Sequence, residues 1–316
     1  MKCLLILNPG SHAGRSRKKF DRIFRLLTVA GIRYDSRITR SLKDAYDISL
    51  EMNGKGYDAI IAVGGDGTIN AVINGFFNNE GVRRSGTKFG VIYTGTSPDF
   101  CKSYNIPTNL KKAVERIITG KTIKIPIGKI ILSFNNTGTG SGAGELNGVR
   151  YFACCANIGL GAALARRANS GIRKGLGDFA GTFVSLIATL IFYKANSFVR
   201  VVDGKTEKIE RMFNTSVGLT PFIASGIKIH HIPEKHPGMF YCMTVKQLKP
   251  GHILRLLKKV YSGKPFSNSN YLSIVYYSKI EFYKNDLNPE LEFDGDPAGY
   301  LPCKIEIAKD TLDLLA

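Results

Sequence analysis

The sequence contains no tryptophan, and only five histidines and six cysteines among its 316 residues. No two cysteines form a Cys-x-x-Cys pair or another zinc-type spacing, which argues against a zinc finger. The adjacent His230 and His231 would face opposite sides of a strand, so they cannot easily share a metal. We expect buried free thiols in a reducing cytoplasm, at Cys3, Cys101, Cys154, Cys155, Cys242 and Cys303.

Long apolar runs are also scarce. Before Asn8 the chain has five apolar residues in succession, too few for a secretion signal, so we predict a buried strand there. The segment 179–193 has fifteen residues without a charge, fewer than the ~20 needed to cross a bilayer. We interpret it as a helix packed on protein, and leave open its contact with a membrane surface.

Acidic residues are few, because twenty-five Asp and Glu stand against forty-four Lys and Arg, for a net charge of +19. This charge favours anionic partners: nucleic acid, an acidic membrane surface or phosphorylated small molecules. With 44% hydrophobic and 22% charged residues, the composition is that of a globular chain. The length corresponds to about two domains.

The first third of the sequence alternates strand and helix patterns. This alternation predicts a parallel sheet with helices on both faces. We expect strands at 2–7, 34–39, 59–63 and 88–93, and helices at 18–30, 42–53, 68–77 and 110–119.

After about Lys121 the pattern becomes strand-rich, which predicts a mainly antiparallel β-sandwich or barrel. We therefore place an α/β domain at 1–123 and a β-rich domain at 124–316, with the last strand a candidate to pack back on the first domain. Helices are expected at 176–193 and 252–261, and a glycine-rich loop at 137–148. Strands are expected at 123–134, 149–157, 199–202, 211–219, 239–246, 271–277, 280–283 and 304–307.

The run Gly64-Gly65-Asp66-Gly67-Thr68 follows a predicted buried strand and opens a helix. Unpaired backbone N–H groups and the helix dipole at such a point favour a phosphate. The run matches neither the Walker A nor the Rossmann pattern, and a tight turn that needs positive φ would also explain the glycines. Loops at 8–14 and 94–100 follow two other strands, so all three should line one crevice at the carboxyl ends of the sheet.

A fourth feature is Glu292-Phe293-Asp294-Gly295-Asp296-Pro297. Carboxylates two residues apart around a glycine suit a metal ligand and a general base. A simple acidic turn is the alternative from spacing alone.

The order of these motifs resembles the diacylglycerol kinase catalytic-domain superfamily, with the bacterial soluble lipid kinases nearer than the sphingosine kinases. The resemblance covers nearly the whole chain and implies the fold of NAD kinases and diacylglycerol kinases in the first domain. The motifs that carry it are NPGSHAG (8–14), VGGDGTIN (63–70), GTSPDF (95–100), FACCANIGLG (152–161), the glycine-rich segment 224–238 and EFDGDPAGYLP (292–302).

The resemblance implies an ATP site between the domains. Asp296 would be the general base, and Asp66, Asp99 and Asp294 would arrange Mg²⁺ and its waters. The ATP phosphates would be wrapped by Gly64, Gly65, Asp66, Gly67, Thr68, Ile69 and Asn70, with Asn8 supporting this loop and Thr39 and Thr96 lining the nucleotide pocket.

Several positions depart from the family pattern. Ala71 replaces the usual Glu, Pro98 an Asn, and Pro126 an Asp, while His236-Pro237 replaces an Asp of a structural Mg²⁺ site. Asp296 is one methylene shorter than the usual Glu. These departures motivate an alternative, a catalytically impaired lipid- or nucleotide-binding homologue.

We therefore expect an ATP- and Mg²⁺-dependent kinase that phosphorylates a primary hydroxyl of a membrane lipid, diacylglycerol or sphingoid-like. It would act at an anionic membrane surface as a cytoplasmic, peripheral protein, with a homodimer possible. Nucleic acid is not expected as a partner, because the charge has no accompanying recognition motif. A soluble substrate, as in the NAD kinases, is disfavoured by the late Asp-Gly-Asp motif. Candidate membrane contacts are Lys18, Lys19, Arg22, Arg25, Arg33, Arg37 and Arg40.

Overall fold

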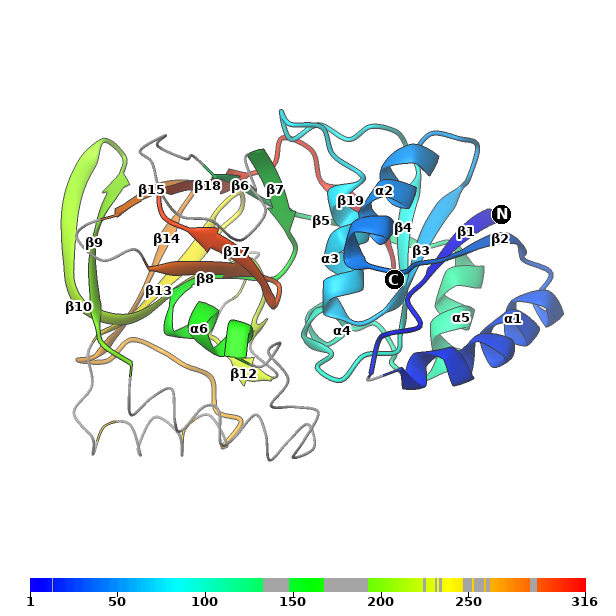
Figure 1. The fold of residues 1–316 in the computed structure, drawn as a ribbon, viewed down its shortest axis with the longest axis horizontal. Coiled ribbons are helices and arrows are strands. Elements are labelled where there is room, and N and C mark those ends of the chain that lie inside the picture. The colour runs from blue at the N-terminus through cyan, green and yellow to red at the C-terminus, as the bar shows by residue number, and fades with distance from the viewer. Residues whose placement is uncertain are drawn as a thin grey trace.

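The structure is a computed structural model of the chain. It has two lobes, each built on its own β-sheet (Figure 1). It describes residues 1–12, 14–132, 148–167, 193–223, 226–230, 232, 235–246, 252, 259, 262–284 and 289–316, without the side chains of residues 164, 165, 284 and 296–298.

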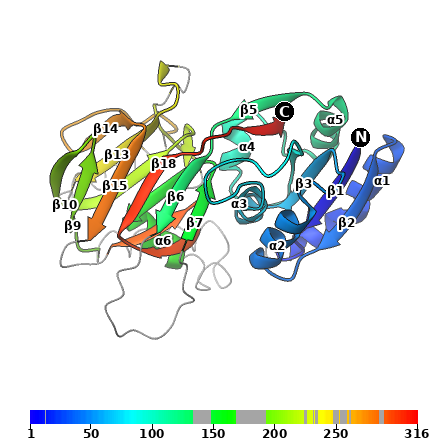
Figure 2. The same cartoon turned by 90° about the horizontal axis from the view of Figure 1, so that it is seen from above.

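The first lobe contains a six-stranded sheet of order β2-β1-β3-β4-β19-β5. Strands β1 to β4 are parallel, as predicted, and β19 is parallel to β4 and antiparallel to β5. The last strand of the chain thus completes the first sheet (Figure 2). The strands are β1 (Lys2–Leu7), β2 (Arg33–Ile38), β3 (Ala59–Gly64), β4 (Lys88–Tyr93), β5 (Thr122–Ile125) and β19 (Leu312–Leu315).

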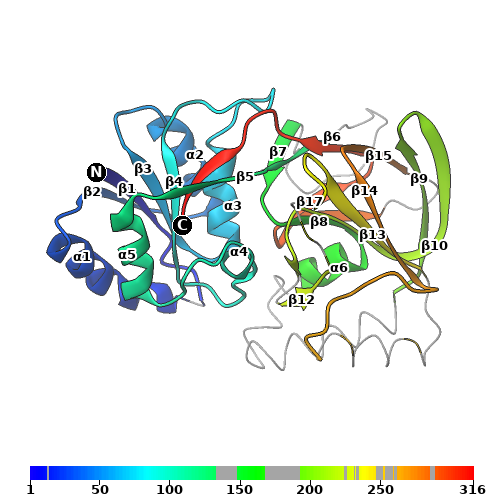
Figure 3. The same ribbon diagram turned by 180° about the vertical axis from the view of Figure 1, so that it is seen from behind.

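Helices cover both faces of this sheet. The helices α2 (Leu42–Met52) and α3 (Asp66–Asn74) pack on one face, and α1 (Phe20–Val29) and α5 (Leu110–Thr119) on the other (Figure 3). Alternate residues of the central strands are buried on opposite faces, which is why these strands are apolar throughout. A short helix α4 (Asp99–Ser103) follows β4.

Helix boundaries follow local capping. Ser41 accepts a hydrogen bond from the Asp44 N–H at the start of α2, and Asn109 caps α5 in the same way. The helix predicted at 18–30 is instead a 3-10 turn, η1 (Arg15–Lys19), followed by α1. Helix α3 begins at Asp66, two residues earlier than predicted.

The second lobe contains an eleven-stranded antiparallel sheet that curls on itself (Figure 1), as expected for a mainly antiparallel β domain. Helix α6 (Leu160–Arg167) follows β8, and a small pair, β11 (Phe222–Ile223) and β12 (Ile227–Lys228), stands apart. The strands of the large sheet are β6 (Gly128–Leu132), β7 (Gly148–Phe152), β8 (Cys155–Gly159), β9 (Asn196–Val202), β10 (Lys205–Gly218), β13 (Phe240–Lys246), β14 (Leu272–Tyr277), β15 (Lys279–Lys284), β16 (Glu290–Phe293), β17 (Asp296–Tyr300) and β18 (Cys303–Ile307).

Two predicted strands are each divided in the structure. The strand expected at 123–134 breaks around Pro126 into β5 and β6, which belong to different sheets. The strand expected at 149–157 breaks at Ala153 and Cys154, whose N–H groups bind a carboxylate instead of a neighbouring strand. The domain boundary at 123/124 stays a prediction; in the structure the chain passes from the first sheet to the second between β5 and β6.

Three predictions lie largely or wholly outside the described residues, namely the glycine-rich loop at 137–148 and the helices at 176–193 and 252–261. Among the residues that are described, no helix is long and apolar enough to span a membrane. All six cysteines are free and buried, as predicted.

Candidate active site

Three loops meet at the carboxyl ends of β1, β3 and β4, as the sequence predicted for adjacent parallel strands. Asn8, after β1, donates a hydrogen bond from Nδ2 to Oγ1 of Thr68 at 2.8 Å. The Gly65 N–H donates to Oγ of Ser11 at 3.1 Å. Asn8 and Ser11 thus hold the glycine-rich loop from the neighbouring strand. Ser11 belongs to the loop 8–14 that is expected to line the crevice, but it is not among the individual site residues predicted from the sequence.

The glycines of this site are required by close packing and not by positive φ. A Cβ on Gly64 would lie 2.3 Å from Oγ1 of Thr68, and a Cβ on Gly95 would lie 2.6 Å from the Cα of Gly65. The φ of Gly65 is −97°, which any residue can adopt. The interpretation as a tight turn that needs positive φ is therefore wrong, and close packing explains Gly64 and Gly95.

The start of helix α3 offers N–H groups ahead of its hydrogen-bonded turns. The Ile69 N–H donates to the Gly65 carbonyl at 3.0 Å. The N–H groups of Asp66, Gly67 and Thr68 come before this first helical hydrogen bond, in the turn where a helix has no carbonyl acceptor of its own for them. Such groups suit phosphate oxygens. Thr68 and Ile69 are 2% exposed, and the side chain of Ile69 belongs to the hydrophobic core. Ile69 could therefore make the predicted phosphate contact only through its backbone, because its side chain is in the core.

Asp66 has an acceptor to spare. Its Oδ2 accepts a hydrogen bond from the Tyr93 hydroxyl at 2.8 Å, while its buried Oδ1 has no hydrogen-bond partner within the described part of the chain. Burial raises the pKa of Asp66 to about 7; the Tyr93 hydrogen bond opposes this increase, and the nearby carboxylates of Asp99 and Asp294 add to it. A cation at Asp66 would relieve this electrostatic cost.

Asp294 is differently placed. Its Oδ2 accepts from Nδ2 of Asn70 at 2.9 Å and from the Ala153 N–H at 2.7 Å, and its Oδ1 accepts from the N–H groups of Cys154 and Cys155 at 2.9 and 3.0 Å. Burial raises the pKa of Asp294, and these four donors oppose the increase. Both oxygens of Asp294 thus already have hydrogen-bond donors.

These contacts test the fit of Mg²⁺. Oxygen ligands suit this cation, and the buried spare oxygen of Asp66 fits it, whereas Asp294 does not fit as a direct ligand in this arrangement. Asp99, 8% exposed, lies at the start of α4. Over the described ranges, three or more His, Cys, Asp or Glu side chains nowhere gather as a ready-made metal cage. A Mg²⁺ would then complete its shell with water and phosphate oxygens.

Helix α3 also fastens the second lobe. Nδ2 of Asn70 and Nδ2 of Asn74 both donate to the Tyr151 carbonyl at 2.9 Å, and the Tyr151 N–H donates to Oδ1 of Asn74 at 2.9 Å. The ring of Tyr151 stacks on Phe77 at 4.9 Å between centroids. Together with the hydrogen bond from Asn70 to Asp294, these contacts fix the position of the glycine-rich loop relative to the late acidic motif.

The remaining predicted residues are spread around this centre. Thr39, 3% exposed, donates its hydroxyl to the Leu7 carbonyl at 3.3 Å beyond the end of β2, whereas Thr96 is exposed. The backbone of Asp296 opens β17 beside Phe293, and its side chain lies outside the described part of the structure. The roles predicted for these three residues stay predictions.

The residues that depart from the family pattern have the following positions in the structure. Ala71 packs against the core, Pro98 precedes α4, and Pro126 lies between β5 and β6. The ring of His236 stacks on Tyr276.

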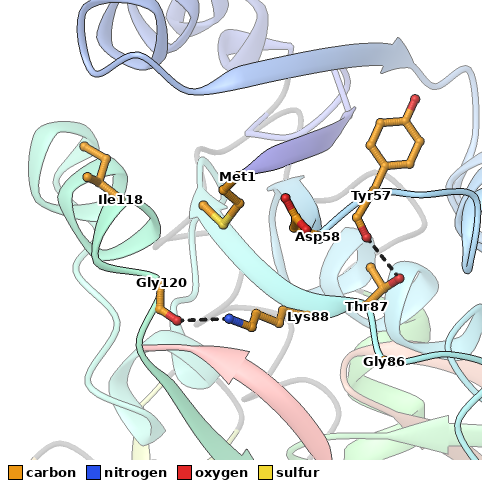
Figure 4. A pocket seen from close by; sticks show the side chains of 8 residues that line it. All are labelled: Met1, Tyr57, Asp58, Gly86, Thr87, Lys88, Ile118 and Gly120. Carbon is orange, nitrogen blue, oxygen red and sulfur yellow. Dashed lines mark hydrogen bonds between the residues drawn. The ribbon is translucent and has the colours of Figure 1, made fainter.

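A cavity lies at the opposite, amino-terminal end of the same strands (Figure 4). It is lined by Met1, Tyr57, Asp58, Gly86, Thr87, Lys88, Ile118 and Gly120. Its polar groups are occupied, since Lys88 donates to the Gly120 carbonyl at 3.2 Å and Asp58 accepts from the Lys2 N–H. This cavity is not part of the candidate site.

Comparison with known proteins identifies the family of the chain. Residues 2–130 match the diacylglycerol kinase catalytic domain, and residues 155–316 match the YegS C-terminal NAD kinase beta sandwich-like domain. These matches define a kinase with a catalytic α/β lobe and a β-sandwich-like lobe. The chain belongs to the diacylglycerol kinase family, as its motifs predicted.

Relatives of similar length support the assignment. The chain is 26% identical over 314 residues to a diacylglycerol kinase of Staphylococcus carnosus, covering 96% of this chain and 92% of the relative. It is 26% identical over 301 residues to a diacylglycerol kinase of Bacillus subtilis, covering 94% and 90%. A crystal structure of a diacylglycerol kinase from Bacillus anthracis has the same fold, with a TM-score of 0.68, 20% identity and coverage of 99% and 96%.

Proposed function

We propose that the protein transfers the γ-phosphoryl group of ATP to a primary hydroxyl of a membrane lipid, with diacylglycerol the first candidate and a sphingoid-like lipid the second. The observation that carries this proposal is the placement of Asp66, with its spare buried oxygen, at the start of α3, while Asn70 of the same helix holds the acidic motif of the second lobe. The names of the curated relatives support the lipid as acceptor.

The nucleotide would lie over the three loops. The first-turn N–H groups of α3 would bind its phosphates, and Thr39 and Thr96 would border the rest of it. Bound Mg²⁺ would supply charge neutralisation of the phosphate oxygens. Asp66 would hold it, and the charges of Asp99 and Asp294 would strengthen the local field.

Asp296 would remove the proton from the lipid hydroxyl as it attacks the γ-phosphoryl group. It follows the turn at Gly295 directly, on the hairpin that Asn70 holds through Asp294. Aspartate in place of glutamate reaches a shorter distance, so the hydroxyl would have to approach this hairpin closely.

The anionic membrane surface is a proposed partner. Residues 1–40 contain ten basic and two acidic side chains, and Lys18, Arg22, Arg25, Arg33 and Arg37 are exposed on η1, α1 and β2. Val29 and Ile38, 84% and 61% exposed, lie in the same part of the chain. A basic surface with apolar side chains is suited to anionic headgroups. The possible homodimer remains a prediction.

The direct experiment incubates the purified protein with labelled ATP, Mg²⁺ and mixed vesicles that each contain one candidate: diacylglycerol, a sphingoid base or phosphatidylglycerol. The expected result is a labelled lipid from the diacylglycerol vesicles. ATP binding by calorimetry without any labelled lipid would favour the alternative, a catalytically impaired homologue, which the substitutions at Ala71, Pro98 and Pro126 motivate.

A further inference from the structure

Glu292 is a buried carboxylate that the function described so far does not use. It is 4% exposed and lies on β16 directly opposite Asn157 of β8. Its Oε1 accepts a hydrogen bond from Nδ2 of Asn157, and its Oε2 accepts from the Gly295 N–H at 2.8 Å. One side chain therefore connects β8 to the turn that precedes Asp296.

This turn has a backbone that needs support. Phe293 pairs with Asp296, so Asp294 and Gly295 form a two-residue connection with φ values of 49° and 90°. A non-glycine residue in the left-handed region costs on the order of 1 kcal/mol. The Asp294 side chain fixes one side of the turn through its four donors, and Glu292 fixes the N–H of Gly295.

Asn157 is itself held in one orientation. Its Oδ1 accepts from the Ser216 hydroxyl and from Nδ2 of Asn214 at 3.3 Å, which leaves its Nδ2 to donate to Glu292. Oδ1 of Asn214 accepts from the Gly161 N–H at 2.8 Å at the start of α6. The turn is thus connected to β10 and α6 through a continuous polar network.

We propose that Glu292 and Asn157 are positioning residues of the phosphoryl-transfer reaction, because they fix the turn that sets where Asp296 begins β17. This inference rests on the proposed kinase function. Two N–H donors face Glu292, and a carboxylate can accept from both, whereas an amide at the same place accepts from only one. The hydrogen bond of the pair therefore has one direction, from the donor Asn157 on β8 to the acceptor Glu292 on β16.

Because this hydrogen bond has one direction, the carboxylate and the amide can be exchanged between positions 292 and 157 as a test. In Glu292→Gln alone, one N–H donor faces the new amide NH₂, and in Asn157→Asp alone two carboxylates face each other. In the double variant, the new carboxylate at position 157 keeps accepting from Ser216 and Asn214, and its second oxygen accepts from the amide at position 292. The amide oxygen at position 292 still accepts from the Gly295 N–H, so the hydrogen bond between positions 157 and 292, the hydrogen bond to Gly295 and the net charge are restored.

The measurements are kcat for lipid phosphorylation, ATP affinity by calorimetry, and hydrogen exchange of the peptide that contains Gly295. Each single variant is expected to lower kcat by roughly 10-fold to 100-fold, since misplacement of a catalytic group by about 1 Å has this effect. ATP affinity is expected to stay within about twofold, because the glycine-rich loop is untouched, and exchange at the turn becomes faster. The double variant is expected to restore kcat and exchange. The matched control is Glu290→Gln, also on β16, whose exposed partner is Arg166.

Three results would overturn the inference. Glu292→Gln with the kcat of an active parent overturns the positioning role and leaves the proposed function standing. Singles that lose kcat, ATP affinity and thermal stability together, with no rescue in the double variant, indicate a general loss of structure instead. A parent that phosphorylates no lipid overturns the proposed function, and the positioning role with it; the parent's own turnover distinguishes this result from the first.

Discussion

Nδ2 of Asn70 and Oδ2 of Asp294 are 2.9 Å apart, although 224 residues separate them in the sequence. The same Asn70 amide donates to the Tyr151 carbonyl, so one side chain of α3 contacts two separate segments of the second lobe. The end of α3 that is proposed to bind phosphate and the hairpin that carries the proposed base are therefore positioned by one part-buried contact. This contact joins two of the motifs that carry the resemblance to the family, 63–70 and 292–302.

Replacement of Asn70 by Asp should destabilise the protein. The new carboxylate would face the buried carboxylate of Asp294 and would lose the donors that bind it and Tyr151. We expect the free energy of unfolding to fall by about 3 kcal/mol or more. Chemical denaturation measures it, and Asn109→Asp, the same change at the exposed cap of α5, is the matched control and should cost little. Equal stability of the two variants would contradict the interdomain role of Asn70.

Gly67→Val tests the phosphate loop. Gly67 lies in the first turn of α3, where backbone N–H groups must approach the phosphates, and a branched side chain would hold them apart. We expect ATP affinity to fall at least about tenfold, with the folded structure retained in circular dichroism. Gly86→Val is the control, since a Cβ at Gly86 meets nothing within 4 Å. Unchanged affinity by calorimetry in Gly67→Val would remove the loop from nucleotide binding.

Asp66 should make stability depend on pH. Burial raises its pKa from 3.8 to about 7, so the folded chain holds the proton more tightly than the unfolded chain. The resulting stabilisation is complete below about pH 4 and is lost as the pH rises through 7. Asp66→Asn removes this titration and should gain stability relative to the parent near pH 8 but not near pH 4, by at most about 4 kcal/mol.

Urea denaturation of both proteins in the absence of Mg²⁺ measures this difference. Addition of Mg²⁺ near pH 8 should then stabilise the parent and leave Asp66→Asn unchanged, because only the carboxylate offers the spare oxygen. Identical pH profiles of parent and variant would show that Asp66 has an ordinary pKa.

Asp296 is predicted to be the general base. Asp296→Asn should lower kcat by roughly 10²-fold to 10⁴-fold with ATP affinity preserved. Asp296→Glu is the more informative companion, because a site adapted to the shorter side chain should gain nothing from it. Lipid phosphorylation by Asp296→Asn at the parental rate would exclude this residue as the base.

Membrane binding should depend on charge. Vesicles with anionic lipid should bind the protein, and binding should weaken as salt shortens the Debye length from ~10 Å at 0.1 M. Combined replacement of Arg22, Arg25 and Arg37 by Gln should reduce sedimentation with vesicles and leave ATP affinity unchanged. Replacement of Lys205 and Lys208, exposed on β10 in the other lobe, is the control. Equal binding to neutral vesicles at high salt would contradict the electrostatic mechanism.

The motifs were predictable because each depends on neighbouring residues. The apolar run Ala59–Gly64 and the glycines after it define a strand, a loop and a helix start within eleven residues, 59–69. The helix expected at 110–119 likewise has the observed bounds of α5. Local patterns could not show the break in the strand expected at 149–157, because it depends on the Asp294 carboxylate far away in the chain. The break in the strand expected at 123–134 falls around Pro126, a residue that has no backbone N–H to donate.

The sequence by itself determined a parallel α/β lobe, an antiparallel β lobe and the loops that meet at one edge of the first sheet. The spacing of apolar residues and the glycines and prolines between the elements are local properties of the sequence. Only the tertiary structure decided how the carboxylates differ. Asp66 keeps a spare oxygen because the donors around it, the Tyr93 hydroxyl and the Phe100 N–H, leave Oδ1 without a partner among the described residues, whereas Asp294 is satisfied by four N–H groups from α3 and the 153–155 segment. The use of Glu292 also depends on its pairing with Asn157, 135 residues earlier. Hydrogen-bond capacity is set by the groups that surround a side chain in space, and these come from distant parts of the chain.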